Sequence, residues 1–146
     1  MAENNIAKLR MKREQLFLML FQHEFHETAE YREQIALFNE NYGEENVTIS
    51  VSNEELTERL FDIVDKLGSI DARLNTAISG WKLNRIGKVD ITILRLAAYE
   101  IMFMSDVPAR VSINEAVELA KKYDDEKSYS FVNGVLHALA DEYAEK

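Results

Sequence analysis

Four cations lie close together near the start of the chain: Lys8, Arg10, Lys12 and Arg13. With Glu3 and Glu14 they give residues 1–22 a charge of +2, although the whole chain of 146 residues carries −9. Cations of this kind bind phosphates, and an aromatic ring nearby can stack on an unpaired base. Phe21 offers such a ring two turns later, with packing in the core as its alternative. The segment predicts a basic arm on an acidic body, and the alternative is a solvated helix end.

No residue pattern predicts catalysis. The chain lacks cysteine, which excludes a disulfide framework, a thiolate metal site and a cysteine nucleophile and fits a reducing cytoplasm. It also lacks the glycine-rich phosphate loops and the G-x-S-x-G motif. His23 and Glu27 are one turn apart, as metal ligands can be, but a solvated helix end is the favoured interpretation. Asp124 and Asp125 are expected to be solvated. We therefore predict no enzyme activity, no cofactor and no metal.

Apolar residues recur every three or four positions along most of the chain, which predicts an all-α fold of about seven helices. One proline and five glycines leave few turns for an all-β sandwich. Residues 43–51 are expected to form a loop or a short extended stretch. The predicted helices cover Asn5–Phe25, Thr28–Tyr42, Ser52–Leu67, Ser69–Ile78, Lys88–Met104 and a segment from Ser112, and a last helix carries Phe131 to Tyr143.

Several single residues carry expectations about how these helices begin, end and pack. Gly68 is predicted to end a helix in a left-handed conformation, and Ser112 is predicted to open one in a capping box with Glu115. Arg95 lies in a very apolar helix and needs an acidic partner, for which Glu115 or Glu118 is expected. Gly134, inside the last helix, suggests a close approach of its backbone by another element.

Neither a signal peptide nor a membrane-spanning segment is predicted. The N-terminus has no apolar core behind a basic start, and no apolar run approaches 18 residues.

Four motifs in the second half of the chain occur in a distinctive order and spacing. They read ILRLAAYE from Ile93, VP at Val107, INEAVELAK from Ile113 and FVNGVL from Phe131. In this order they strongly resemble the NusB family of bacterial transcription antitermination factors. The resemblance is specific from Trp81 onward and looser before it.

The resemblance implies a single NusB-like domain over residues 1–146, built of two packed helical sub-bundles at about 1–67 and 69–146. It implies no catalytic activity and a cytoplasmic role in transcription regulation. The implied partners are NusE, which is also a ribosomal protein of the small subunit, single-stranded boxA RNA and the RNA polymerase antitermination complex on ribosomal-RNA operons. Whether the chain is a monomer or a homodimer is left open.

The resemblance also assigns roles by position. The cations named above are implied to contact RNA phosphates, and Phe21, Phe131 and Asn133 to contact bases or sugars. Packing in the core is the alternative for Phe131, and capping of a neighbouring helix is the alternative for Asn133. Asp90 falls where the family presents an acidic residue to NusE. Two alternatives stay open: an accessory RNA-binding module of a ribosomal-RNA-modifying enzyme, and a structural helical interaction protein.

Overall fold

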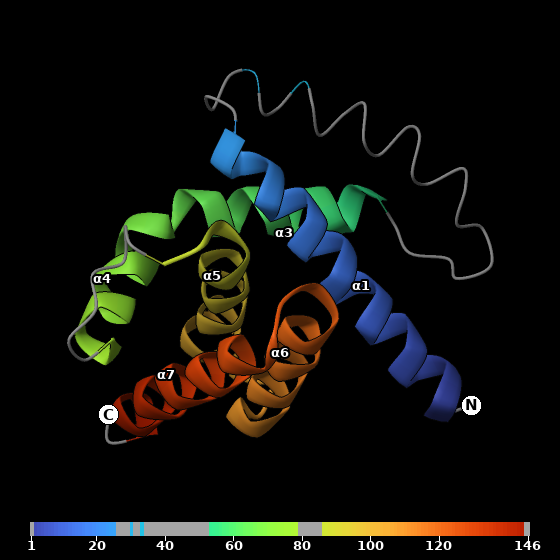
Figure 1. The fold of residues 1–146 in the computed structure, drawn as a ribbon. Coiled ribbons are helices and arrows are strands. Elements are labelled where there is room, and N and C mark those ends of the chain that lie inside the picture. Colours follow the sequence, from blue (N-terminus) through green and yellow to red (C-terminus); the bar gives the residue numbers. More distant parts are fainter. Residues whose placement is uncertain (1, 26–29, 31–32, 34–52, 79–85, 145–146) are drawn as a thin grey trace. The chain divides into compact units, whose positions relative to one another are not determined.

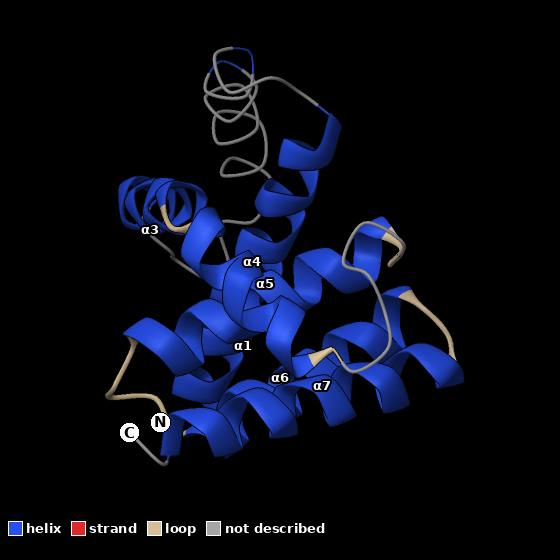
Figure 2. Cartoon of the chain, turned by 90° about the vertical axis from the view of Figure 1, so that its left-hand side faces the viewer, coloured by secondary structure: helices blue, strands red, loops and turns tan. Residues whose placement is uncertain are grey.

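The computed structural model describes residues 2–25, 30, 33, 53–78 and 86–144. All regular structure among them is helical, and Figure 2 shows no strand in the described part of the chain. The elements, labelled in Figure 1, are α1 (Ala2–Gln22), the 3-10 turn η1 (His23–Phe25), α3 (Asn53–Asp65), α4 (Leu67–Ala77), α5 (Lys88–Phe103), α6 (Ala109–Tyr123) and α7 (Glu126–Ala144). The predicted all-α fold is confirmed.

Some predicted elements fall on residues that the structure does not describe. Of the helix expected over Thr28–Tyr42, only Glu30 and Glu33 are described, and both are helical. The stretch 43–51, the capping residue Ser52 and most of the link that starts at Trp81 lie outside the described residues.

The chain divides into two compact units, Met1–Val64 and Asp65–Lys146. In the first unit, α1 buries the side chains of Leu16, Phe17, Met19 and Leu20, and α3 buries those of Leu56, Leu60 and Ile63. These residues recur at helical spacing, so each helix has one apolar face, as the sequence predicts. Leu9, an apolar residue seven positions before Leu16 in the helix predicted over Asn5–Phe25, is instead 52% exposed.

In the second unit, α5 is the central helix. It contacts α4, α6 and α7, and α7 also packs on α4 and α6. Figure 1 shows α4, α6 and α7 arranged around α5. Nine residues of α5 are buried, including Ile93, Leu94 and Ala98. A helix whose residues are mostly buried suits this central position. The first turn of α5 lies next to α7, because Ser128 of α7 bonds to Asp90.

Two predicted helix boundaries are wrong. The third helix ends at Asp65, Lys66 forms the turn, and α4 begins at Leu67. Gly68 is therefore inside α4 and is not a left-handed end residue. Similarly, α6 begins directly after Pro108, whose backbone φ of −60° already suits a helix start. Ser112 is thus buried inside α6, where its hydroxyl donates a hydrogen bond of 2.8 Å to Oε1 of Glu100 on α5.

Arg95 and Gly134 carry the two remaining expectations about packing. Arg95 pairs with Asp71 on α4, an acidic residue that the sequence did not single out. The pattern correctly demanded an acidic partner, but α5 has three neighbouring helices, and periodicity alone does not say which one faces Arg95. Among the described residues, no heavy atom lies within 4 Å of the position that a Cβ at Gly134 would take, so none of the described helices makes the expected close approach there.

Candidate functional site

The basic segment lies on the first half of α1, in the first unit. Arg10 is exposed, and Arg13 is half-buried. Lys12 donates a hydrogen bond of 2.9 Å to Oε1 of Glu55 on α3, which joins the two helices by an ion pair. Lys8 belongs to α1, but its side chain is outside the described part. The basic segment therefore includes a lysine whose charge is already compensated within the protein.

The ion pair between Lys12 and Glu55 lowers the pKa of Glu55 but contributes little to the stability of the fold. The hydrogen bond and the positive charge of Lys12 lower the pKa of Glu55, and the charge of Arg59 adds to this effect. The Lys12 side chain is 29% exposed and that of Glu55 52% exposed. An ion pair at such a surface contributes at most about 1 kcal/mol, so a phosphate group can compete for the lysine.

A row of three aromatic rings follows the basic segment, two on α1 and the third at the end of η1. The rings of Phe17 and Phe21 are stacked, with centroids 6.1 Å apart and an interplanar angle of 22°. Phe21 then meets Phe25 edge to face at 5.1 Å. Phe17 is fully buried and Phe21 is half-buried. Phe21 therefore adjoins the core on one side and the surface on the other, which agrees with both interpretations of this residue.

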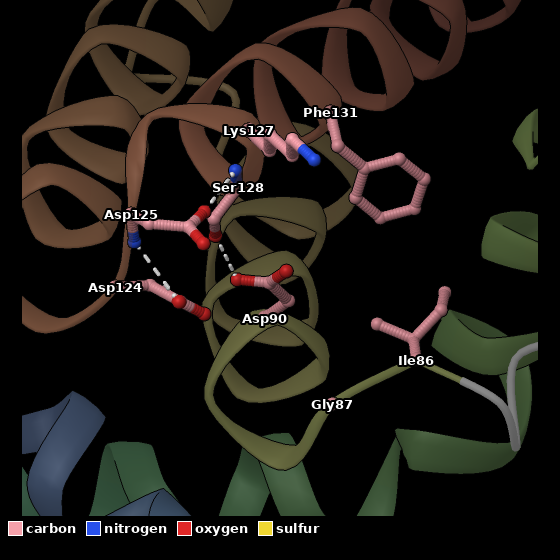
Figure 3. Close-up of a pocket in the computed structure, with 8 residues that line it drawn as sticks. All are labelled: Ile86, Gly87, Asp90, Asp124, Asp125, Lys127, Ser128 and Phe131. Carbon is pink, nitrogen blue, oxygen red and sulfur yellow. Dashed lines mark hydrogen bonds between the residues drawn. The ribbon is translucent and has the colours of Figure 1, made fainter.

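The second group of predicted site residues lies in the second unit, around a pocket of about 400 Å³ (Figure 3). The segment before α5, the first turn of α5 and the start of α7 all contribute to it. Its lining residues are Ile86, Gly87, Asp90, Asp124, Asp125, Lys127, Ser128 and Phe131. Asp90 and Phe131, which are 41 positions apart in the sequence, thus share one pocket.

Asp90 is held on the pocket wall by α7. The hydroxyl of Ser128 donates a hydrogen bond to Oδ1 of Asp90, as drawn in Figure 3. Partial burial raises the pKa of Asp90, and the hydroxyl of Ser128 opposes this effect. The neighbouring carboxylates of Asp124 and Asp125 raise the pKa further, because like charges disfavour ionisation. The pocket therefore presents an acidic group in a place where negative charge is already concentrated.

Asp125 has a structural role that the sequence interpretation missed. Its Oδ1 accepts a hydrogen bond of 2.9 Å from the backbone N–H of Ser128, which caps the first turn of α7. The backbone N–H of Asp125 in turn bonds to Oδ1 of Asp124 at 2.9 Å. An aspartate directly before a helical apolar stretch is an N-cap signal. That signal could have identified Asp125, whereas no pattern indicated Ser128.

Asn133 is exposed on α7 and does not line the pocket. It is two residues from Phe131, and residues two apart on a helix do not share a face. The structure therefore brings Asp90 and Phe131 together and separates Asn133 from them. Lys127 joins the pocket although the sequence did not single it out.

The described residues contain no group of three histidine, cysteine, aspartate or glutamate side chains placed to hold a metal ion. His23 lies in η1, and Glu27, its predicted co-ligand, is outside the described residues. A search of the described helices for one long and apolar enough to cross a membrane found none.

Comparison with known proteins decides between the hypotheses. A sequence profile of the NusB family matches residues 10–141. The chain belongs to the NusB family. The transcription antitermination protein NusB of Lachnoclostridium phytofermentans is 51% identical over 129 residues, which are 88% of this chain and 96% of that protein. The protein of the same name from Agathobacter rectalis is 46% identical over 128 residues, 88% of this chain and 95% of its own length.

Solved NusB structures share the fold. T. maritima NusB is 34% identical and superposes with a TM-score of 0.74 over 94% of this chain and 96% of its own. A second match is a chain in a crystal structure of the antitermination factors NusB and NusE in complex with dsRNA. It is 25% identical to this chain, with a TM-score of 0.73 over 93% of this chain and 98% of its own length. The predicted family, the antitermination function and the absence of enzyme activity are confirmed by membership in this non-enzymatic family.

Proposed function

We propose that this NusB-family chain binds boxA RNA together with NusE, in the cytoplasm, and so supports transcription of ribosomal-RNA operons by RNA polymerase. The likeness to a NusB chain solved with NusE and dsRNA supports both partners. The overall charge of −9 favours a division of labour, in which a basic partner protein and the basic segment of α1 share the RNA.

The observation that carries the RNA assignment is the continuity of α1 from Ala2 to Gln22. One unbroken helix holds Arg10 and Arg13 at a fixed separation from the ring of Phe21. At about 1.5 Å per residue, Arg10 and Phe21 are about 16 Å apart along the axis. A single RNA strand can bind these cations through its phosphates and stack a base on the ring a few nucleotides later. Proteins that bind single strands combine these two kinds of contact.

The pocket of the second unit supports the remaining roles. Asp90 is proposed to meet a cationic group of NusE, because the carboxylate is partly exposed and Ser128 fixes its direction. Phe131 supplies a ring beside it, and we propose this ring and the exposed amide of Asn133 as RNA contacts. Lys8 and Lys12 complete the proposed phosphate contacts on α1.

The test is RNA affinity measured by fluorescence anisotropy, with a labelled single-stranded boxA oligonucleotide, with and without NusE. We expect weak binding by the chain alone and much tighter binding with NusE, because two joined surfaces act as one site. A scrambled strand and a duplex of the same length show which form of RNA is bound. RNA affinity that NusE does not change would contradict the shared site.

The protein half of the proposal is tested by Asp90→Lys. The substitution should weaken the complex with NusE in calorimetry, because it places like charges together. Asp106→Lys is the control, since Asp106 is an exposed acid in the turn between α5 and α6, outside the pocket. Equal affinity for the two variants would remove Asp90 from the interface. Light scattering on the same samples distinguishes a monomer from a homodimer.

A further inference from the structure

Phe25 is one of the large apolar side chains that the described residues expose to solvent. It is 54% exposed and ends η1, directly after α1. Single exposed apolar residues are ordinary on protein surfaces and need no explanation. Phe25 differs because it is the outer member of a continuous row of rings.

The row leads from the core to the solvent. Phe17 is 2% exposed, Phe21 is half-buried and Phe25 is 54% exposed. The contact of 5.1 Å between the rings of Phe21 and Phe25 is edge to face, an arrangement that aromatic pairs favour. The inner rings thus fix the position of the outer ring while much of its surface stays accessible.

The row also continues the basic face of α1. Arg10 and Phe21 are separated by about three helical turns, so they lie on nearly the same side of the helix. Phe17 falls between them on that side, and Arg13 is within one turn of Phe17. Lys12 points to another side and is held by Glu55. The arginines of α1 are thus followed by the half-buried ring of Phe21 and the exposed ring of Phe25 in η1. This order matches the chemistry of a single-stranded nucleic acid, whose phosphates bind cations and whose unstacked bases bind rings.

We propose that Phe25 is a second base-stacking residue, which extends the RNA track from Arg10 and Arg13 through Phe21 to the end of η1. This inference depends on the proposed function, because it lengthens the same RNA-binding surface. Neither the sequence motifs nor the resemblance marked Phe25. The proposal predicts that the bound strand covers one more base than the cations and Phe21 alone would hold.

Phe103 provides a matched comparison. It is 41% exposed and also follows an aromatic residue by one helical turn, with the rings of Tyr99 and Phe103 5.6 Å apart. Phe103 lies in the second unit, at the end of α5, and no arginine row leads to it along α5. It should therefore take no part in RNA binding.

The experiment measures the affinity of the chain with NusE for single-stranded boxA RNA. Phe25→Ala should weaken binding by about 5- to 150-fold, the range found for loss of one stacked base. Its dependence on salt should stay unchanged, because no charge is lost. Phe25→Trp should keep the affinity, and Phe103→Ala should bind like the unchanged protein. An RNA series with one abasic position at a time sharpens the test. Removal of one particular base should lower the RNA affinity of the unchanged protein but not that of Phe25→Ala.

The outcomes separate the inference from the proposed function. If the unchanged protein with NusE does not bind the RNA, the proposed function fails and the inference fails with it. If the unchanged protein binds and folded Phe25→Ala binds equally well, only the inference is overturned. Should Phe25→Ala not fold, Phe25→Leu keeps an apolar side chain of similar size without a ring. A loss of affinity in Phe25→Leu supports stacking, and full affinity overturns it.

Discussion

Arg95 on α5 binds Asp71 on α4 through two parallel hydrogen bonds, from Nε to Oδ1 and from Nη2 to Oδ2, each 2.9 Å long. The two side chains are only 15% and 25% exposed. This geometry uses the planar fork of the guanidinium, which a lysine does not reproduce. The pair fixes α4 against the central helix of the second unit.

We expect Asp71→Asn to lower the free energy of unfolding by about 1–3 kcal/mol, because it leaves a largely buried guanidinium without its charge partner. The double variant Asp71→Leu with Arg95→Leu should be less destabilised, since no charge is then left behind. Urea denaturation followed by circular dichroism measures both. Arg110→Leu, at an exposed arginine on α6, is the control. The single variants Asp71→Leu and Arg95→Leu complete the cycle. A double variant that loses the sum of their two losses would show that the pair is not coupled.

The core of this fold could be predicted from the sequence, whereas the polar contacts between its helices could not. In the helix predicted over Ser69–Ile78, the residues Ile70, Leu74 and Ile78 recur every four positions, and all three are buried, because burial follows the side of a helix that carries apolar residues. The partner of Arg95 depends on which of three neighbouring helices faces it. Spacing within one helix holds no information on that choice.

In the candidate site, too, some features could be predicted from the sequence and others could not. Asp90 and Phe131 were assigned by resemblance, and the structure adds that they share one pocket. Ser128 could not be predicted, because its contact with Asp90 exists only after α7 packs against α5. The basic segment was visible in the sequence as a local excess of charge, but its pairing with Glu55 was not, since that contact joins residues 43 positions apart.

We expect Glu55→Gln to raise the RNA affinity of the chain with NusE by about two- to threefold and to steepen its dependence on salt by up to about 0.7 in the log–log slope. The substitution leaves Lys12 without the carboxylate that now binds it. Glu58→Gln removes the same charge from an exposed position on α3 and serves as the control. Equal effects of the two variants would mean that Lys12 does not contact RNA.

The same substitution should change the pH dependence of stability slightly. The pKa of Glu55 is lowered in the folded chain, so its ion pair stabilises the fold above the ordinary pKa of glutamate. That contribution is lost as the pH falls through the lowered pKa. Because the pair is exposed, the difference at neutral pH should be no more than a few tenths of a kcal/mol. Thermal unfolding of both proteins between pH 3 and 7 measures it.

The contribution of Asp90 to stability should depend on pH in the opposite direction. Its pKa is raised in the folded chain, so the folded state holds its proton more tightly than the unfolded state does. The stability from this proton is present below the ordinary pKa of aspartate, about 3.9, and is lost as the pH rises through the raised value. Asp90→Asn should therefore be more stable than the unchanged chain at pH 7, and this gain should vanish near pH 3.

NusE binding provides the second readout for Asp90. Asp90→Asn should bind NusE more weakly at pH 7, since the carboxylate is proposed to face a cation. Acidification should weaken binding of the unchanged chain at a higher pH than an ordinary aspartate would produce. Asp106→Asn is the control in both measurements, because Asp106 lies outside the pocket. A variant that is more stable but binds NusE with full affinity would separate Asp90 from the interface.

The two arginines and Phe131 should affect RNA binding in different ways. Arg10→Ala with Arg13→Ala should lower affinity for every RNA sequence and flatten the log–log salt slope by up to about 1.4, because two phosphate contacts are lost. Phe131→Ala should cost about 1–3 kcal/mol of binding free energy with an unchanged slope, if a base stacks there. Anisotropy titrations at several salt concentrations distinguish the two. An unchanged slope in the arginine variant would identify the basic segment as a solvated helix end.

Gly134 should be replaceable with a gain in stability. It lies inside α7, is exposed, and has no heavy atom of the described part of the chain within 4 Å of where a Cβ would be. Gly134→Ala should therefore raise the free energy of unfolding by about 0.5–1 kcal/mol, the usual advantage of alanine over glycine in a helix. Ala138, exposed one turn later on the same helix, allows the reverse exchange. Ala138→Gly should cost a similar amount, and the variant carrying both changes should unfold at nearly the same urea concentration as the unchanged chain. A loss of stability in Gly134→Ala would mean that another part of the protein approaches this glycine in solution.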